Sequence, residues 1–462
     1  MDADYYDEYF DDYYNENDLD MEIFEPRFEN MWSDCVWPSL IQITIYTLKF
    51  ISVNFAFRIL TQTFGVKFRI WNHFVSILCG TILIWMSVEG GYVYIYGFII
   101  ISYLVIWILS KIRQRKVGYV ISCFILSVLL LCGYLEPDKR LWHQIRGTLM
   151  IIVMKIISLG FDLDATKTKE LPSLFQYLGY LFCPASVILG PWHSYNEYTY
   201  IFESPKWNLN YFISIILNSL LSITFLLMSN CFIYGIIPDN LWKWLIAYRD
   251  AFAFRNSHYF ISFLSQATMV TAGFGSSDNL SRYTRAVGYE VTIPHKIEMP
   301  RSLLQVVVRW NIPMHNWFKQ YVFRVIKPHG TFLAVLSTYL ISSILHGLNL
   351  QLSALLLSLG FYTYVEYKLR QKLSTIYNTC TLPNPCKPGC SHESKKIFTR
   401  FLNILFSLLT IFHLAYLGVM FEAAFHIQEQ GFSLSHTLDK WRSLDFASHW
   451  IVLISYLFYL VI

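Results

Sequence analysis

The chain has 462 residues, of which 55% are hydrophobic and 15% are charged. Soluble domains carry about 25% charged residues, so a water-soluble fold of this size would lack the polar side chains to cover its surface. The net charge of +4 is unevenly distributed: residues 1–34 hold 13 acidic residues and one basic residue, whereas the remainder holds 35 basic and 19 acidic residues. We expect an acidic head followed by a basic membrane body.

The head, 1–34, interleaves Asp and Glu with tyrosines and has no amphipathic period. It also lacks the basic start and apolar core of a secretory signal peptide. This composition is typical of a disordered, solvated tail, with tyrosine sulfation or partner docking as the alternative. No internal repeat stands out in the remainder, so we predict a single membrane domain, 35–462.

Long stretches without Asp, Glu, Lys or Arg follow one another along this domain, and each reaches the roughly 18–20 residues that a helix needs to cross a bilayer core. Unpaired backbone groups cannot lie in hydrocarbon, so we predict an all-α, polytopic transmembrane bundle of about 10–12 helices. A soluble helical core is the disfavoured alternative. The strong candidates are 71–88, 90–110, 117–135, 171–196, 207–238, 256–277, 328–365 and 401–421, and the weaker ones are 36–60, 141–161 and 446–462.

Two longer hydrophilic segments, 278–327 and 366–400, are rich in Lys and Arg, as is the short patch 111–116. Basic loops favour the cytosolic side of a membrane, so we place all three there. The run 328–365 is long enough for two crossings with a break near His346. The two crossings would then form a hairpin, with His346 at or near its lumenal end.

His346 is the strongest candidate for chemistry, because an ionisable side chain at membrane depth is costly and is often functional. A neutral imidazole, with a reference pKa of about 6.5 that burial lowers, can accept a proton from an alcohol. The alternative is a histidine that only hydrogen-bonds neighbouring helices. Asn311 is the second candidate, because Pro313 predicts a break in the backbone that can line a cavity; a helix cap or turn is its plainer interpretation.

The sequence contains no Gly-x-Ser-x-Gly, His-Glu-x-x-His, Walker or Rossmann motif, and no His-x-x-x-x-Asp motif supports the other common acyltransferase class. Nine cysteines are present. Six of them lie in or beside apolar runs, where cysteine behaves as a small hydrophobic residue, and we assign no special role to Cys35, Cys79, Cys123, Cys132, Cys183 and Cys231. The others, Cys380, Cys386 and Cys390, are followed by His392 and are compatible with unmodified or lipidated thiols, zinc, or a disulfide.

The pair Trp310-Asn311 with Leu345-His346-Gly347 resembles the Asn and His pair of the membrane-bound O-acyltransferase family. Further motifs across 35–462 resemble one branch of that family, whose members transfer palmitoleate to a serine of Wnt proteins. They are Trp142–Gly147, Ser158–Asp164, Gly190–Trp192, Pro300–Ser302, Ile411–Gly418 and Ala447–Trp450. The acidic head departs from the family pattern, so the resemblance implies nothing for it.

The resemblance implies a tunnel through the helical bundle in which a cytosolic fatty acyl-CoA meets a lumenal protein substrate in the endoplasmic reticulum membrane. His346 would be the general base and Asn311 would hold the thioester or stabilise the oxyanion. Arg301 and Arg324 would bind the CoA phosphates, and Trp310 would shape the adjacent wall. The partners implied are palmitoleoyl-CoA, a Wnt protein and membrane lipid; we assign no resident cofactor, no metal and no nucleic acid.

Two other classes of protein also fit many apolar helices. A proton-coupled transporter would use an intramembrane histidine, although the two halves of the chain show no inverted repeat. A membrane-anchored scaffold would act through the acidic head. A carrier would leave no acyl group on a serine, and a scaffold would lose its function on removal of 1–34.

Overall fold

A computed structural model describes residues 30–65, 68–112, 116–165, 171–203, 207, 209–275, 289–347, 350–386, 390, 396–421 and 434–462. Every regular element in these residues is a helix, so the all-α prediction is confirmed for the part of the chain that the structure describes. The predicted tail, 1–34, falls outside these residues except for its last five.

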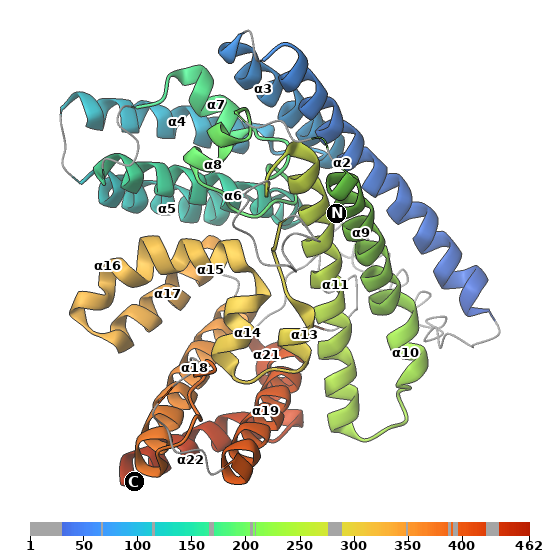
Figure 1. The fold of residues 1–462 in the computed structure, drawn as a ribbon, viewed down its shortest axis with the longest axis vertical. Helices are drawn as coiled ribbons and strands as arrows, with labels where there is room; N and C mark the ends of the chain where they lie inside the picture. The colour runs from blue at the N-terminus through green and yellow to red at the C-terminus, as the bar shows by residue number, and fades with distance from the viewer. Residues whose placement is uncertain are drawn as a thin grey trace, which may run out of the picture.

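The N-terminal half of the chain forms two groups of helices (Figure 1). α4, α5 and α6 lie side by side, while α2, α9 and α11 pack together at the other side of the picture. The elements are η1 (Trp32–Val36), α2 (Trp37–Thr63), α3 (Arg69–Ser87), α4 (Tyr92–Lys111), α5 (Val117–Leu135), α6 (Lys139–Asp164), α7 (Leu174–Leu181), α8 (Tyr195–Tyr200), α9 (Leu209–Leu227), η2 (Met228–Phe232), α10 (Ile233–Ile236) and α11 (Lys243–Ala272).

The C-terminal half begins with short helices and ends with long ones. α14 and α15 lead from the centre of the molecule towards α16 and α17, and α18, α19, α21 and α22 form the lower part of Figure 1. The elements are α13 (Pro294–Glu298), α14 (Leu303–Trp310), α15 (Ile312–Phe318), η3 (Lys319–Phe323), α16 (Arg324–Ile326), η4 (Lys327–His329), α17 (Thr331–Leu345), α18 (Leu350–Tyr377), α19 (Lys396–Gly418), α21 (Leu434–Ser443) and α22 (Ala447–Val461).

Six helices among the described residues are long and apolar enough to cross a membrane, or seven if the bent pair formed by α21 and α22 is one span. They make the chain a multi-pass membrane protein. The predicted total of about 10–12 also counted long helices that do not meet this test. α6 and α11 account for two of the predicted spans that fail it, because residues 151–160 and 262–274 are buried without interruption. A helix that is enclosed by protein, not lipid, tolerates polar residues when they are paired.

Lys155 shows how such a residue is accommodated at the centre of α6. Its side chain is fully buried, and its ammonium donates to the carbonyl of Tyr180 at 2.9 Å and to the hydroxyl of Ser186 at 2.8 Å. The cost of burying a charge falls when its donors are satisfied. α6 is therefore an internal helix of the bundle, consistent with its weak signal as a span.

The predicted span 171–196 is wrong. This run forms the eight-residue helix α7, then turns, and then the six-residue helix α8. Pro184 and Pro191 explain the outcome, because proline lacks the backbone donor that a continuous helix requires. The segment is nevertheless largely buried, which accounts for its apolar composition.

Cys35 and Cys231 form a disulfide with a Cα–Cα distance of 5.8 Å, so our interpretation of these two residues as unpaired hydrophobic side chains is wrong. They are 196 residues apart in sequence, and only the packing of η1 against η2 brings them together. Disulfides persist in oxidising compartments, which favours a lumenal position. From there, crossings by α2, α3 and α4 bring Lys111 to the cytosol, in agreement with the charge rule.

Candidate active site

His346 lies at the C-terminal end of α17, in the turn that leads into α18. The two helices pack against each other, so the predicted hairpin with a break at His346 is confirmed. The backbone N–H of His346 donates to Ser342 at 3.1 Å and that of Gly347 to Ile344 at 2.9 Å. The imidazole is partly buried, and none of the described residues hydrogen-bonds to either ring nitrogen.

Gly347 fixes the direction of this turn. Its φ of +81° lies in the left-handed region that favours glycine. A Cβ atom at this position would meet Arg146 Cδ at 3.1 Å and Trp142 Nε1 at 3.4 Å, both on α6. The turn therefore presses directly against α6, and His346 lies beside a cationic residue to which sequence reasoning gave no role.

Asn311 occupies a break between α14 and α15, two residues before Pro313. Its backbone is extended, with φ −145° and ψ 93°, and its side-chain Oδ1 accepts the N–H of Met314 at 3.1 Å. The predicted break is present, and the plainer interpretation of Asn311 as a helix cap is also correct. Because Oδ1 serves the cap, the amide nitrogen is the group left to donate. No described hydrogen bond joins Asn311 to His346.

A short strap of backbone, residues 291–293, holds this break in place. Ile312 N–H donates to Val291 at 2.8 Å, and Ile293 N–H donates to Arg309 at 3.1 Å. The strap in turn donates from Val291 N–H to the side chain of Gln266 on α11 at 2.7 Å, and Gln266 donates to Asn218 on α9 at 2.8 Å. A chain of buried polar groups thus runs from two membrane helices to Asn311.

Trp310 is positioned by aromatic neighbours. The ring of His258, on α11, stacks on it with centroids 4.1 Å apart and an interplanar angle of 8°. His258 Nε2 also lies 3.0 Å from the Trp310 carbonyl oxygen. The ring of Phe254 stacks on that of Phe421, with centroids 4.0 Å apart. Sequence reasoning missed His258, because its place at 52 residues from Trp310 carries no local signal.

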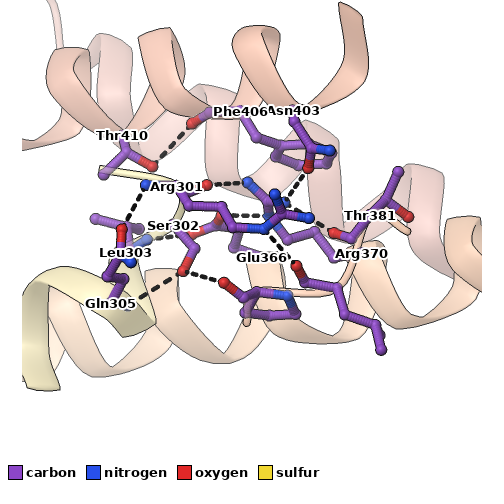
Figure 2. A network of polar contacts seen from close by, with 12 residues as sticks. Arg301, Ser302, Leu303, Gln305, Glu366, Arg370, Thr381, Asn403, Phe406 and Thr410 are labelled. Atoms are coloured by element: carbon purple, nitrogen blue, oxygen red, sulfur yellow. Dashed lines mark hydrogen bonds and ion pairs between the residues drawn. The ribbon is translucent and has the colours of Figure 1, made fainter. Parts of the chain in front are cut away.

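Arg301 lies in a buried polar network at the start of α14 (Figure 2). Its guanidinium donates to the carbonyls of Leu382 at 3.0 Å and Cys380 at 2.6 Å. Its own carbonyl accepts from Arg370, which pairs with Glu366 at 2.6 Å. Glu366 also accepts the backbone N–H of Leu303 at 2.8 Å. These contacts favour a role for Arg301 in positioning α14 over the predicted contact with phosphate.

Arg324, in contrast, is exposed and lines a cavity of about 490 Å³, a size typical of small-molecule sites. The cavity lies between α15, η3 and the segment 192–197, and its polar wall includes Asn316, Lys319 and Gln320. Asp162 and Glu197 also line it, so the wall carries both signs of charge. Arg324 belongs to the basic segment that we predicted to be cytosolic.

The long apolar helices define a polytopic membrane protein, and the comparisons give its class. The model of the membrane-bound O-acyltransferase family matches residues 94–390. The chain belongs to this family and is an acyltransferase. Membership disfavours the transporter and scaffold alternatives.

Three relatives narrow the class. The chain is 37% identical over 465 residues to the protein-serine O-palmitoleoyltransferase porcupine of Anopheles gambiae, with 94% of each protein covered. It is 35% identical over 412 residues to the human protein of the same name, with 81% of this chain and 88% of the relative covered. Lysophospholipid acyltransferase 1 of Arabidopsis thaliana is 22% identical over 351 residues, with 64% of this chain and 72% of the relative covered.

Proposed function

We propose that this chain transfers palmitoleate from palmitoleoyl-CoA to a serine hydroxyl of Wnt proteins in the endoplasmic reticulum membrane. The observation that carries the proposal is the 37% identity to a protein-serine O-palmitoleoyltransferase over 94% of both chains. That similarity extends over the helices that carry His346 and Asn311, as well as over the membrane spans. Transfer to the secreted protein would enable its release and signalling.

In the proposed reaction, a ring nitrogen of neutral His346 accepts the serine proton while the serine oxygen attacks the thioester carbonyl. The carbon–sulfur bond then breaks, and the CoA sulfur takes the proton from the imidazolium as it leaves. A positioned general base of this kind contributes about 10²–10⁴-fold to a rate. The turn of Gly347 against α6 supports this role, because it holds His346 in one direction.

Asn311 would stabilise the charge that develops on the thioester oxygen. Its Oδ1 is engaged by Met314 N–H, so its rotamer is fixed and its amide N–H groups point away from the cap. Such a preorganised donor acts without reorganisation at the moment of reaction. Trp310 is held by His258 and would form the wall beside this donor.

The two substrates would approach from opposite sides of the membrane through a tunnel between the helices. The disulfide between Cys35 and Cys231 favours a lumenal position for the start of α2, and the basic segments favour the cytosol. An acyl chain in an apolar passage gains about 0.8 kcal/mol for each CH₂ that is buried. A sixteen-carbon chain can therefore be retained while its thioester reacts.

Arg324 is the candidate for binding the CoA phosphates from the cytosolic side. Hydrogen bonds to charged groups contribute about 1.5–3 kcal/mol, so Arg324→Ala is expected to raise KM for palmitoleoyl-CoA by roughly 10–100-fold, with little change in kcat. Steady-state kinetics at fixed peptide concentration measures this. Lys296→Ala is the control, because it removes an exposed cation of the same basic segment outside the cavity. If both variants raised KM equally, Arg324 would act only through the general positive charge of this segment and not as a specific phosphate ligand.

The proposed function is tested by incubating the purified full-length protein with labelled palmitoleoyl-CoA and a serine-containing Wnt peptide. We expect label on the peptide, stable to thiol reagents and absent from the matching Ser→Ala peptide. A lysophospholipid acceptor belongs in the same assay, because a more distant relative is named for that activity. Label on the lipid and none on the peptide would overturn the proposal.

A further inference from the structure

The loop that follows α18 brings three thiols to one point. The Sγ atoms of Cys380, Cys386 and Cys390 all lie within 4.8 Å of one another, and those of Cys380 and Cys390 are 3.4 Å apart. A disulfide would require about 2.05 Å, and none of the three is disulfide-bonded. Zinc–sulfur bonds of about 2.3 Å in a tetrahedron place two sulfur ligands about 3.8 Å apart. The observed spacing therefore fits three ligands around one ion.

We propose that Cys380, Cys386 and Cys390 bind a zinc ion outside the acyl-transfer site. Three thiolates would occupy three tetrahedral positions, and a water molecule could complete the fourth. This proposal goes beyond the proposed acyl transfer and does not depend on it. It also selects one of the alternatives that the sequence left open; His392, in the same sequence cluster, lies outside the described residues and is not part of the proposed site.

The backbone at the start of this loop, residues 380–382, is fixed in place by donors on α18 and α19 and just before α14 (Figure 2). The carbonyl of Cys380 accepts from Arg301 at 2.6 Å and from Asn403 on α19 at 3.2 Å. The carbonyl of Thr381 accepts from Arg370 on α18 at 2.8 Å. Backbone held in this way positions the Cys380 thiol, which lowers the ordering cost of binding an ion.

The donor set favours zinc over other common ions. Calcium and magnesium prefer oxygen ligands, and the iron–sulfur clusters of proteins are usually held by four cysteines. Thiolates are soft ligands that select zinc or copper(I). Three thiolates and one Zn²⁺ leave a net charge of −1, and the guanidinium of Arg301 on the Cys380 carbonyl lies beside it. The location at the basic end of α18 favours the cytosol, where thiols remain reduced.

A metal in this loop would also support the acyl-transfer machinery. Arg301, which binds the carbonyls of Cys380 and Leu382, lies two residues before α14. α14 ends at Trp310, next to Asn311. The ion would thus fasten the loop to the start of the helix that carries the thioester-binding break. We infer a structural role, with an indirect effect on activity.

The test is the metal content of the purified full-length protein, measured by inductively coupled plasma mass spectrometry. We expect one zinc ion per chain and a loss of nearly all of it in Cys380→Ser, Cys386→Ser and Cys390→Ser, because metal affinity depends on the number of thiolate ligands. Cys123→Ser is the matched control, because it removes an exposed thiol on α5. This variant should retain the ion.

A second measurement covers the case in which a serine variant fails to fold. Wild-type protein stripped by a chelator and reloaded with Co²⁺ should show the absorption of cobalt–thiolate charge transfer, which oxygen ligands do not produce. Wild-type protein that contains no metal, with these cysteines mapped as a disulfide or a hydroxylamine-sensitive thioester, would overturn the proposal. Active protein without zinc would contradict only this inference, and inactive protein with zinc only the proposed function.

Discussion

Replacing His346 by alanine is expected to lower palmitoleoyl transfer by about 10²–10⁴-fold, the contribution of a positioned general base, while palmitoleoyl-CoA still binds. The fold should survive, because His346 ends α17 through its backbone N–H to Ser342 and not through its ring. Gly347 would continue to hold the turn against α6. Single-turnover transfer of labelled palmitoleate measures the loss, and ligand-dependent thermal stability measures binding.

His329→Ala is the matched control for this variant. His329 is exposed and lies in η4, just before the opposite end of the same helix, so its removal tests the loss of a histidine without loss of the base. We expect its activity to equal that of the wild type. Full activity in His346→Ala would show that His346 is not the general base. A parallel loss of acyl-CoA binding would instead make His346 part of the binding site.

The sequence is informative where one local cause decides the structure. Charge-free runs in α3, α4 and α5 give helices long and apolar enough to cross a membrane, because lipid imposes apolar side chains over the whole length of a crossing helix. The break near His346 is also recognisable, since the run 328–365 is too long for one crossing. Pro313 likewise predicts an interruption close to Asn311, where the structure has one.

The sequence is less informative where distant segments meet. The disulfide between Cys35 and Cys231 depends on the packing of η1 against η2, and the cysteines themselves lie in apolar surroundings that suit unpaired residues equally well. The prediction of a membrane span at 171–196 was wrong for a related reason. Apolar composition reports burial, and burial inside a protein bundle permits turns that burial in lipid does not.

The candidate site shows the same division. Trp310, Asn311 and His346 could be named from their motifs, but the groups that orient them could not. Gln266 reaches the strap at Val291 from α11, and a glutamine inside an apolar helix gives no hint of its acceptor. Arg301 was named for its charge. Only the structure shows that its guanidinium already donates to two backbone carbonyls.

Two variants of Asn311 separate its role as a cap from its role as a donor. Asn311→Ala removes both, so we expect kcat to fall by about 10²–10³-fold, or about 2.7–4 kcal/mol. Loss of the cap should also destabilise the protein by about 1 kcal/mol. Asn311→Asp keeps an oxygen that can accept the N–H of Met314 and places a favourable charge at a helix N-terminus. It lacks the amide donor, so activity should fall at least as far while thermal stability remains near that of the wild type.

Measurement of kcat, KM for the peptide and thermal stability on both variants distinguishes the possible roles. Ser173→Ala, which removes the cap of α7 away from the site, should lower stability without lowering kcat. If Asn311→Asp were as active as the wild type, the cap alone would be its function. If only KM for the peptide rose, Asn311 would bind the protein substrate. The donor role requires that kcat fall even when the cap is intact, because only the transition state carries the charge that the amide would stabilise.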